Sequence, residues 1–135
     1  MATKGIGTTF TFTPAGGSAT RVGILSAIGE LNCDSEMIDV TTLDESSGCR
    51  RFMQGPRDAG ELRLTGFMSK TDAGQLALRA AWQSGAAGTA LITFPDGLTA
   101  SFPALVKSYS LGAAQVDGAI GFSCVLRADG AVTFA

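Results

Sequence analysis

Acidic and basic side chains gather between residues 30 and 61 of this chain. Eight of the twelve acidic residues lie there, and the first six of them, up to Glu45, come with no basic residue among them. Arg50, Arg51 and Arg57 then follow closely. Guanidinium groups and carboxylates form strong charge-assisted hydrogen bonds. We therefore interpret the acidic part and the basic part as opposite sides of a contact between copies of the chain.

Catalytic interpretations of these residues are weak. The sequence has no histidine, which excludes Ser-His, Cys-His and histidine-ligated metal arrangements. Asp34, Glu36 and Asp39 lack the central glycine and distal glutamate of a calcium-binding loop. Glu30 and Glu61 are candidates for a carboxylate pair that hydrolyses sugars, but two unrelated surface acids are the more common case. The sequence therefore predicts no enzyme, no cofactor and no metal site.

The three cysteines, Cys33, Cys49 and Cys124, form no CxxC pair, and their odd number indicates free thiols rather than a disulfide framework. A reactive role would require a nearby cation. Arg50 and Arg51 follow Cys49 directly, yet an ordinary loop thiol is the favoured interpretation.

Length and composition predict one ordered domain covering residues 1–135. Hydrophobic residues make up 45% of the chain and charged residues 16%, and the net charge is −2. So little charge indicates that partners cover part of the apolar surface, and the charge balance disfavours general nucleic-acid binding. We expect no membrane span and no signal peptide, and hence synthesis in the cytoplasm.

Most of the remaining sequence has the period-two alternation of half-buried β-strands. In residues 21–31 the alternation places Val22, Ile24, Ser26 and Ile28 on one face. The strand predicted over 61–67 has a polar face of Glu61, Arg63 and Thr65. Further strands are expected over 8–13, 89–94, 98–108, 119–126 and 132–134. We expect residues 1–20 to form an N-terminal arm that carries the first of these strands.

One α-helix is predicted, over residues 71–84. Asp72 can cap its first turn, Gln75 completes the spacing of a capping box, and Gly85 is placed to end it. Leu78 and Trp82 share one face, which we expect to pack on the sheet. The fold class predicted is mainly β, a sandwich or barrel with one flanking helix and a long inter-strand loop.

That loop covers residues 32–60, with a turn expected at Ser46–Gly48 and a break at Gly55–Pro56. So long an insertion in a small domain usually binds something. Its charged residues and one phenylalanine are the candidates for contact with another copy: Asp34, Glu36, Asp39, Asp44, Glu45, Arg50, Arg51, Phe52 and Arg57.

The order of several short motifs resembles the tail tube proteins of long-tailed bacteriophages. These motifs are Met37–Asp44, Cys49–Gly55, Asp58–Leu62, Asp72–Gln75, Thr93–Gly97, Phe102–Val106, Val116–Leu126 and Thr133–Ala135. The resemblance covers the chain from about Gly23 onward. It rests on order, spacing and length rather than on any single motif.

The resemblance implies a β-sandwich whose copies form hexameric rings that stack into a tube. It further implies that the long loop and the N-terminal segment mediate stacking, and that DNA crosses the lumen without specific binding. A tape measure protein, a tail terminator and distal tail or baseplate proteins are the implied partners. The implied location is the virion tail, assembled in the host bacterial cytoplasm. Glu61, Arg63 and Thr65 are candidates for the lumen surface, as are the acids near Asp34.

Two alternatives remain at this point. One is the tube protein of a related device, such as a gene transfer agent or a type VI-like tube. The other is a small β-sandwich adhesion or binding module, which would have an apolar pocket near Trp82.

Overall fold

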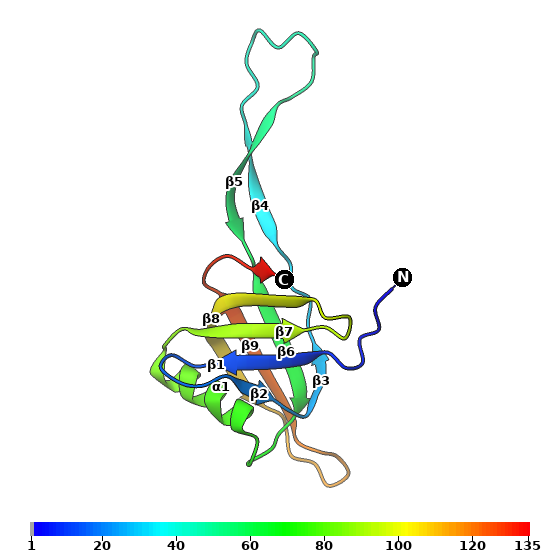
Figure 1. The fold of residues 1–135 in the computed structure, drawn as a ribbon, viewed down its shortest axis with the longest axis vertical. Helices are drawn as coiled ribbons and strands as arrows, with labels where there is room; N and C mark the ends of the chain where they lie inside the picture. The colour runs from blue at the N-terminus through cyan, green and yellow to red at the C-terminus, as the bar shows by residue number, and fades with distance from the viewer. Residues whose placement is uncertain (1) are drawn as a thin grey trace.

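A computed structural model describes residues 2–135 as a mainly β body from which one long hairpin projects (Figure 1). The strands are β1 (Thr9–Thr13), β2 (Thr20–Val22), β3 (Leu25–Ile28), β4 (Asp34–Asp39), β5 (Phe52–Asp58), β6 (Glu61–Phe67), β7 (Gly88–Thr93), β8 (Thr99–Leu111), β9 (Gly121–Ala128) and β10 (Thr133–Phe134). The one helix in the described residues is α1 (Ala73–Ser84).

The strands of the body form one antiparallel sheet in the order β2-β1-β7-β8-β9-β6-β3, with β10 added beside β8. Strand β8 lies between β7 and β9 and so joins the two halves of this sheet. Its residues Thr99 to Ala104 pair with β7 and its residues Ala104 to Leu111 pair with β9, and the β8–β9 register shifts between Val106 and Ser108. Because such irregularities bend a strand, the sheet curls around its apolar face. The two outermost strands, β2 and β3, are consecutive in the chain, so the curled sheet has its two edges joined by residues 23–24.

The expected alternation explains the core. Phe10 and Phe12 of β1 and Leu62 and Leu64 of β6 are fully buried, while the residues between them are not. β7, β8 and β9 follow the same rule and contribute Ile92, Phe102, Phe122 and Leu126, among others. Because successive side chains point to opposite faces of a strand, the alternation in the sequence gives each strand one apolar face, and these faces form a common core.

The single strand expected over residues 21–31 is wrong. It is divided at Ile24, which has a φ of 59°, a conformation that β-branched residues rarely adopt. The Ile24 carbonyl accepts a hydrogen bond from the Phe67 N–H at 3.0 Å, and Gly66 lies so close that a Cβ there would collide with this carbonyl. Ile24 is consequently exposed, not buried beside Val22.

The helix ends at Ser84 as predicted and begins at Ala73, two residues after the predicted start. The Asp72 side chain accepts the Gln75 N–H at 3.0 Å, and Gly85 ends the helix with a φ of 72°. The Gln75 side chain does not complete a capping box. It is buried and instead accepts from the Ser69 N–H and donates to the Phe67 carbonyl, both at 2.9 Å.

One helix-packing expectation is confirmed and the other is wrong. Leu78 is fully buried in the core, but Trp82 is 50% exposed and lies outside it. The helix presents Gly74, Gln75, Leu78 and Ala81 inward. Trp82 follows Ala81 by one residue, which turns it about 100° away from that side chain.

The long inter-strand loop expected over residues 32–60 contains a two-stranded antiparallel hairpin, β4–β5, over residues 34–58. The break expected at Gly55–Pro56 is also wrong, because both residues lie within β5. The register passes from Ser35–Arg57 to Met37–Gln54, so these two residues face Glu36 alone in a bulge. A bulge tolerates proline because it breaks the ladder locally.

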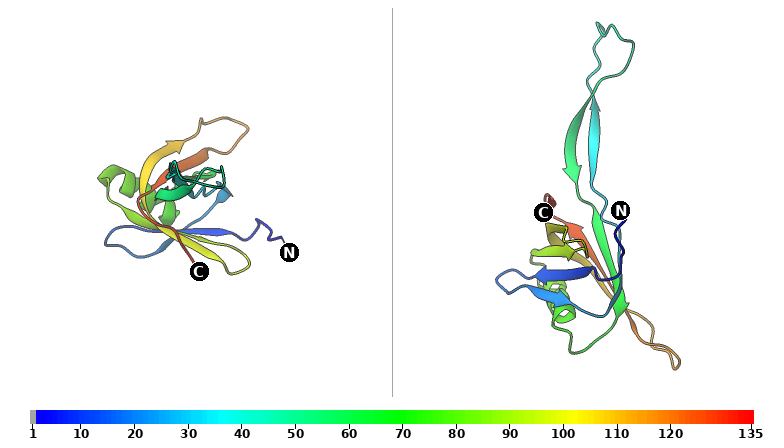
Figure 2. Two further views of the ribbon diagram at one scale, coloured as in Figure 1. Left: turned by 90° about the horizontal axis from the view of Figure 1, so that it is seen from above. Right: turned by 45° about the vertical axis from the view of Figure 1, so that its right-hand side comes forward.

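The arm expected over residues 1–20 is much shorter. β1 lies inside the sheet between β2 and β7, with Phe10 and Phe12 in the core. Of the expected arm, only residues 2–8 precede the first strand of the sheet; Met1 lies outside the described residues. Figure 2 shows that the β4–β5 hairpin and the turn between β8 and β9 project from opposite ends of the molecule. The molecule thus has distinct ends, which head-to-tail assembly requires.

Candidate assembly surfaces

The β4–β5 hairpin exposes apolar side chains on both of its faces. Met37, Ile38, Val40, Phe52 and Met53 are all exposed, and the hairpin that carries them projects away from the body (Figure 1). Cross-strand partners share a face, so Ile38 lies beside Met53 on one face and Phe52 beside Asp39 on the other. A two-stranded hairpin is marginally stable by itself in water. An apolar hairpin that stands away from its own body is therefore suited to packing against another molecule.

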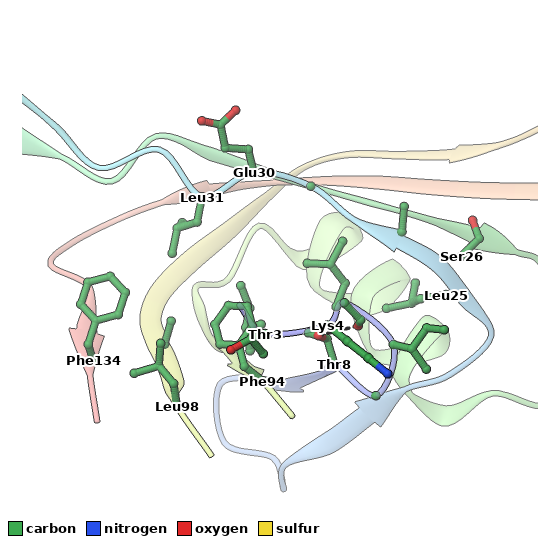
Figure 3. A pocket seen from close by; sticks show the side chains of 18 residues that line it. Thr3, Lys4, Thr8, Leu25, Ser26, Glu30, Leu31, Phe94, Leu98 and Phe134 are labelled. Carbon is green, nitrogen blue, oxygen red and sulfur yellow. Dashed lines mark hydrogen bonds between the residues drawn. The ribbon is translucent and has the colours of Figure 1, made fainter. Parts of the chain in front are cut away.

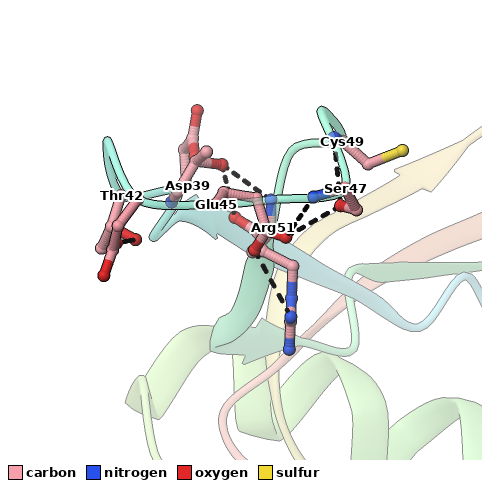
Figure 4. Close-up of polar contacts among 8 residues, drawn as sticks. Asp39, Thr42, Glu45, Ser47, Cys49 and Arg51 are labelled. Carbon is pink, nitrogen blue, oxygen red and sulfur yellow. Dashed lines mark hydrogen bonds and ion pairs between the residues drawn. The ribbon is translucent and has the colours of Figure 1, made fainter.

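The candidate charges at the hairpin tip are paired within the subunit (Figure 4). Arg50 Nη1 lies 3.2 Å from Asp39 Oδ2, and Arg51 Nη1 lies 3.6 Å from Glu45 Oε2. Both arginine side chains remain mostly exposed. The acidic part and the basic tip thus meet inside one hairpin in the single subunit, and any contact with another copy would have to exchange or share these partners.

Hydroxyl groups hold the acids of the tip in place. The Glu45 carboxylate accepts the Ser47 N–H and hydroxyl, and the Asp44 carboxylate accepts the Thr42 hydroxyl. These bonds lower the pKa of Glu45 and of Asp44, and a bond from Thr41 is the main cause of the lowered pKa of Asp39. These bonds favour the ionised carboxylates, and Gly48 takes the left-handed conformation of the expected turn.

The remaining candidates on the hairpin lie nearer the body. Asp34 and Glu36 are exposed on β4, and Arg57 is exposed on β5 opposite Ser35. The structure does not bring Arg57 into an ion pair among the described residues. These side chains therefore leave charge of both signs available at the base of the hairpin.

A second surface is the polar face of the sheet around β6. Glu61, Arg63 and Thr65 are exposed, as the alternation predicted, and Leu62 and Leu64 point into the core. The sequence analysis missed the partners of this face. Lys107 Nζ lies 2.7 Å from Glu61 Oε1, which lowers the pKa of that carboxyl.

A matching pair lies beside it, where Arg127 Nη2 is 2.6 Å from Asp58 Oδ2. The hydrogen bond from Arg127 is the main cause of the lowered pKa of Asp58. Arg127 is directly opposite Glu61 in the β6–β9 register. Each of these two acids on the face is therefore paired with a base, while Arg63 is in none of the ion pairs of the described residues. The period-two pattern of β9 could have revealed Arg127, but Lys107 lies within the bulge of β8 and has no such signal.

The alternative chemistries gain no support from these positions. Glu61 is engaged by a lysine and its pKa is lowered, the opposite of what a general acid needs. Among residues 2–135, no three metal-ligating side chains of the histidine, cysteine and acidic types come together. Cys33 and Cys49 are exposed and unbonded to each other, and burial raises the pKa of the Cys124 thiol to about 12. No helix in the described residues is long and apolar enough to cross a membrane.

A third surface, which sequence reasoning did not find, is a cleft of about 930 Å³ between β3, the β7–β8 turn and the N-terminal residues (Figure 3). Leu25, Phe94, Leu98 and Phe134 line it. Trp82 is not part of the lining, so the pocket expected for a binding module near that residue is not this one. The cleft depends on residues from four distant segments, and no local pattern predicts it.

The whole architecture matches solved structures of tube and tail proteins. A chain from the tail of an empty gene transfer agent particle with C6 symmetry superposes with a TM-score of 0.80 at 22% identity, covering 99% of both chains. The SPP1 tail tube protein gives a TM-score of 0.73 at 20% identity, covering 98% of this chain and 78% of that one. A chain of the anti-feeding prophage baseplate gives 0.73 at 12% identity, covering 100% and 97%. The fold is thus one shared by subunits of phage-like tails.

Sequence comparison narrows this class to one family. The family model described as lambda phage tail tube protein, TTP, matches residues 8–135. The chain therefore belongs to the lambda tail tube protein family, and it is a structural protein of the phage tail tube type. No curated protein matches its sequence. The resemblance expected from the motifs, the mainly β fold class and the structural function are confirmed.

Proposed function

We propose that copies of this chain form six-membered rings that stack head to tail into a bacteriophage tail tube, through which DNA leaves the virion. The observation that carries this proposal is the apolar β4–β5 hairpin, which projects from the body of a tail tube family member and has no cover of its own. We infer that the hairpin, which projects from the body (Figure 1), reaches beyond its own ring. Its candidate contact residues, including Phe52 and the arginines of the tip, would then meet the next ring.

The polar face around β6 is our candidate for the lumen surface. Its acids and bases are paired as Glu61–Lys107 and Asp58–Arg127. Paired charges offer phosphates little net attraction, which suits a conduit that DNA must leave quickly. Arg63 and Thr65 would complete this surface between the pairs.

The proposed tube needs further proteins at its ends and inside it. A terminator and a baseplate would cap the ends, and a tape measure protein would fill the lumen before DNA does. Assembly would take place in the host bacterial cytoplasm, and the product would be part of the virion tail. The tube of a related device, such as a gene transfer agent, uses the same architecture, and the match to the gene transfer agent tail supports this variant of the proposal.

Negative-stain electron microscopy of the purified, concentrated protein tests the assembly. We expect end views with six-fold symmetry and a central hole, together with side views of stacked rings. Because some tubes grow only from an initiator, the experiment includes a parallel sample with the distal tail complex added. A protein that stays monomeric in both samples, by sedimentation and by microscopy, contradicts the proposal.

A further inference from the structure

The β4–β5 hairpin joins the body through two short segments. On one side, β5 leads into β6 with Ala59 and Gly60 between them (Figure 2). On the other side, residues 29–33 connect β3 to β4. Leu31 packs against the core and Ala59 is 7% exposed, so the body holds both segments at these points. Beyond them, β4 and β5 form a separate two-stranded sheet.

The chain changes direction between the hairpin and the body at Gly60. This residue has a φ of 77°, a left-handed conformation that glycine adopts without steric cost. A Cβ at this position would lie 3.0 Å from the Asn32 carbonyl oxygen, so the two segments are in close contact here. The Gly60 carbonyl accepts the Ala128 N–H at 3.0 Å, which ties this point to β9. Because hinges are a few residues that absorb changes in φ and ψ, small rotations at Ala59 and Gly60 would swing the whole hairpin.

The Asp58 side chain fixes the angle at this point. Asp58 is the last residue of the hairpin strand β5. Its Oδ1 accepts the Gly60 N–H at 2.8 Å, and its Oδ2 lies 2.6 Å from Nη2 of Arg127, which belongs to β9. The bond from Arg127 and then the bond from Gly60 lower the pKa of Asp58. One charged carboxylate thus connects the hairpin, the turn and the body.

A second cleft, of about 460 Å³, lies on one side of these segments. The hairpin contributes Cys33, Gln54 and Arg57 to its lining, and the turn between β9 and β10 contributes Ala131 and Val132. Figure 1 shows this turn beside the base of the hairpin. We call this hollow the base cleft. It gives the hairpin a direction in which it can lean without displacing a residue of the core cluster.

We propose that residues 59–60 and 29–33 form a hinge, and that the Asp58–Arg127 ion pair is a latch that holds the hairpin upright. When the latch opens, the hairpin leans into the base cleft. The two side chains are 54% and 42% exposed, and exposed ion pairs are individually weak, so a molecule that binds this face can release the latch. The consequence for a tube, that the latch sets the direction in which each hairpin leaves its ring, rests on the proposed function.

Distance measurements between two spin labels test the hinge in the single subunit. The exposed thiols are removed by Cys33→Ser and Cys49→Ser, and labels are attached at two exposed sites, Ile38→Cys on β4 and Gln83→Cys on α1. Cys124 stays unlabelled because it is buried, and burial raises its pKa to about 12. Double electron–electron resonance at a concentration below assembly should give one narrow distance distribution.

Loss of the latch should free the hairpin. Arg127→Gln should broaden the distribution roughly twofold, because a second orientation becomes populated once the contact that favours the first is removed. Asp58→Asn should act in the same way, although its amide oxygen can still accept the Gly60 N–H. Arg127→Lys keeps a cation within reach of Asp58 and should retain a narrow distribution. Arg63→Gln is the matched control, because Arg63 is an exposed base on the same face and is in none of the ion pairs of the described residues.

Disulfide formation across the base cleft tests the direction of the motion. Cys33 is kept, Cys49→Ser removes the other exposed thiol, and Ala131→Cys places a thiol on the opposite wall. Under mild oxidation, the intramolecular disulfide should form about tenfold faster when Arg127→Gln is added, since the leaning state is otherwise a minor one. Cys33 with Ala86→Cys, an exposed site outside the base cleft, should give no such disulfide in either background.

The outcomes are separate from those of the proposed function, because both measurements use the single subunit. A broader distribution and a faster disulfide in Arg127→Gln support the hinge and its latch. A distribution that Arg127→Gln and Asp58→Asn leave unchanged, or that is already broad in the intact subunit, overturns the latch. Equal disulfide rates with and without Arg127→Gln overturn the leaning into the base cleft. A protein that never forms rings or tubes overturns the proposed function and leaves the latch standing.

Discussion

At the scale of single residues, the ion pairs of the polar sheet face determine its charge. Glu61 and Asp58 are each within hydrogen-bonding distance of a base on another strand. Their pKa values are lowered, primarily by these hydrogen bonds. The two ion pairs therefore stay ionised at physiological pH, and Arg63, which is in none of the ion pairs of the described residues, adds one positive charge to this face.

The lowered pKa of Glu61 predicts how the stability of the fold depends on pH. A carboxyl whose pKa is lower in the folded state stabilises the fold above its unfolded pKa, and this contribution is lost as the pH falls through the folded value, below 4.5. An NMR titration of the carboxyl carbons should place the midpoint of Glu61 below 4.5. Lys107→Met should raise it toward 4.5.

Lys70→Met is the control for that titration, because Lys70 is exposed and is in none of the ion pairs of the described residues. It should leave the midpoint of Glu61 unchanged. A midpoint that does not move in Lys107→Met would show that the pair does not persist in solution. Because both partners are exposed, we expect the effect on overall stability to be small.

At the scale of elements, Asp72 connects the helix to the bend that closes the sheet. Its carboxylate accepts the Gln75 N–H at 3.0 Å and the Gly23 N–H at 3.2 Å. The neighbouring Gln75 side chain binds the Phe67 carbonyl and the Ser69 N–H. One polar cluster thus fixes the start of α1, the end of β6 and the junction of β2 with β3.

Asp72→Ala should lower the free energy of unfolding by about 1–3 kcal/mol. The cap alone is worth roughly 0.5–2 kcal/mol, and the partly buried Gly23 N–H also loses its partner. Urea unfolding followed by circular dichroism, at a concentration below assembly, measures the loss. Asp72→Asn should recover part of it, because an amide oxygen still accepts both bonds.

The control for the cap is Asp129→Ala, since the Asp129 side chain is exposed and makes no hydrogen bond among the described residues. Equal stability of Asp72→Ala and Asp129→Ala would contradict the anchoring role. The N-cap itself was predictable from its position before an apolar helical pattern. The bond to Gly23 was not, because it joins residues 49 positions apart.

The strand predicted over 21–31 and the break predicted at Gly55–Pro56 were wrong, and the structure gives a physical reason for each. The strand over 21–31 has good alternation, but Ile24 adopts a left-handed conformation that its own side chain disfavours and that the contact with Phe67 and Gly66 maintains. The break at Gly55–Pro56 is a bulge instead, because its partner strand can oppose two residues with one. In both cases a partner strand decided the local conformation.

At the scale of the whole molecule, the β4–β5 hairpin and the body are separate in their energetics. The core cluster contains no residue of β4 or β5. The hairpin has its own ladder of backbone pairs and its own contacts at the tip, and its apolar side chains are exposed to solvent. Assembly, not folding of the single subunit, is therefore the process that should depend on it.

Replacing residues 36–56 by Asn-Gly, which joins the paired residues Ser35 and Arg57 through a tight turn, tests this separation. The free energy of unfolding should change by less than about 1 kcal/mol, because no core contact is removed. Stacked tubes should be absent by microscopy, while rings or single subunits remain. Unfolding of the shortened body would show that the hairpin is needed for the fold, and normal tubes would contradict its role in stacking.

The sequence by itself determined the local features: the period-two strands that define the core face, the capped helix, the polar face of β6 and the charge-rich insertion that marks the chain as one that assembles. Each depends on residues within a few positions of one another. The fold decided what depends on distant residues brought together. It turned the insertion into an apolar hairpin, exposed Trp82, paired Glu61 with Lys107 and formed the cleft beside β3. Such outcomes follow from chain topology and register, which no local pattern of residues fixes.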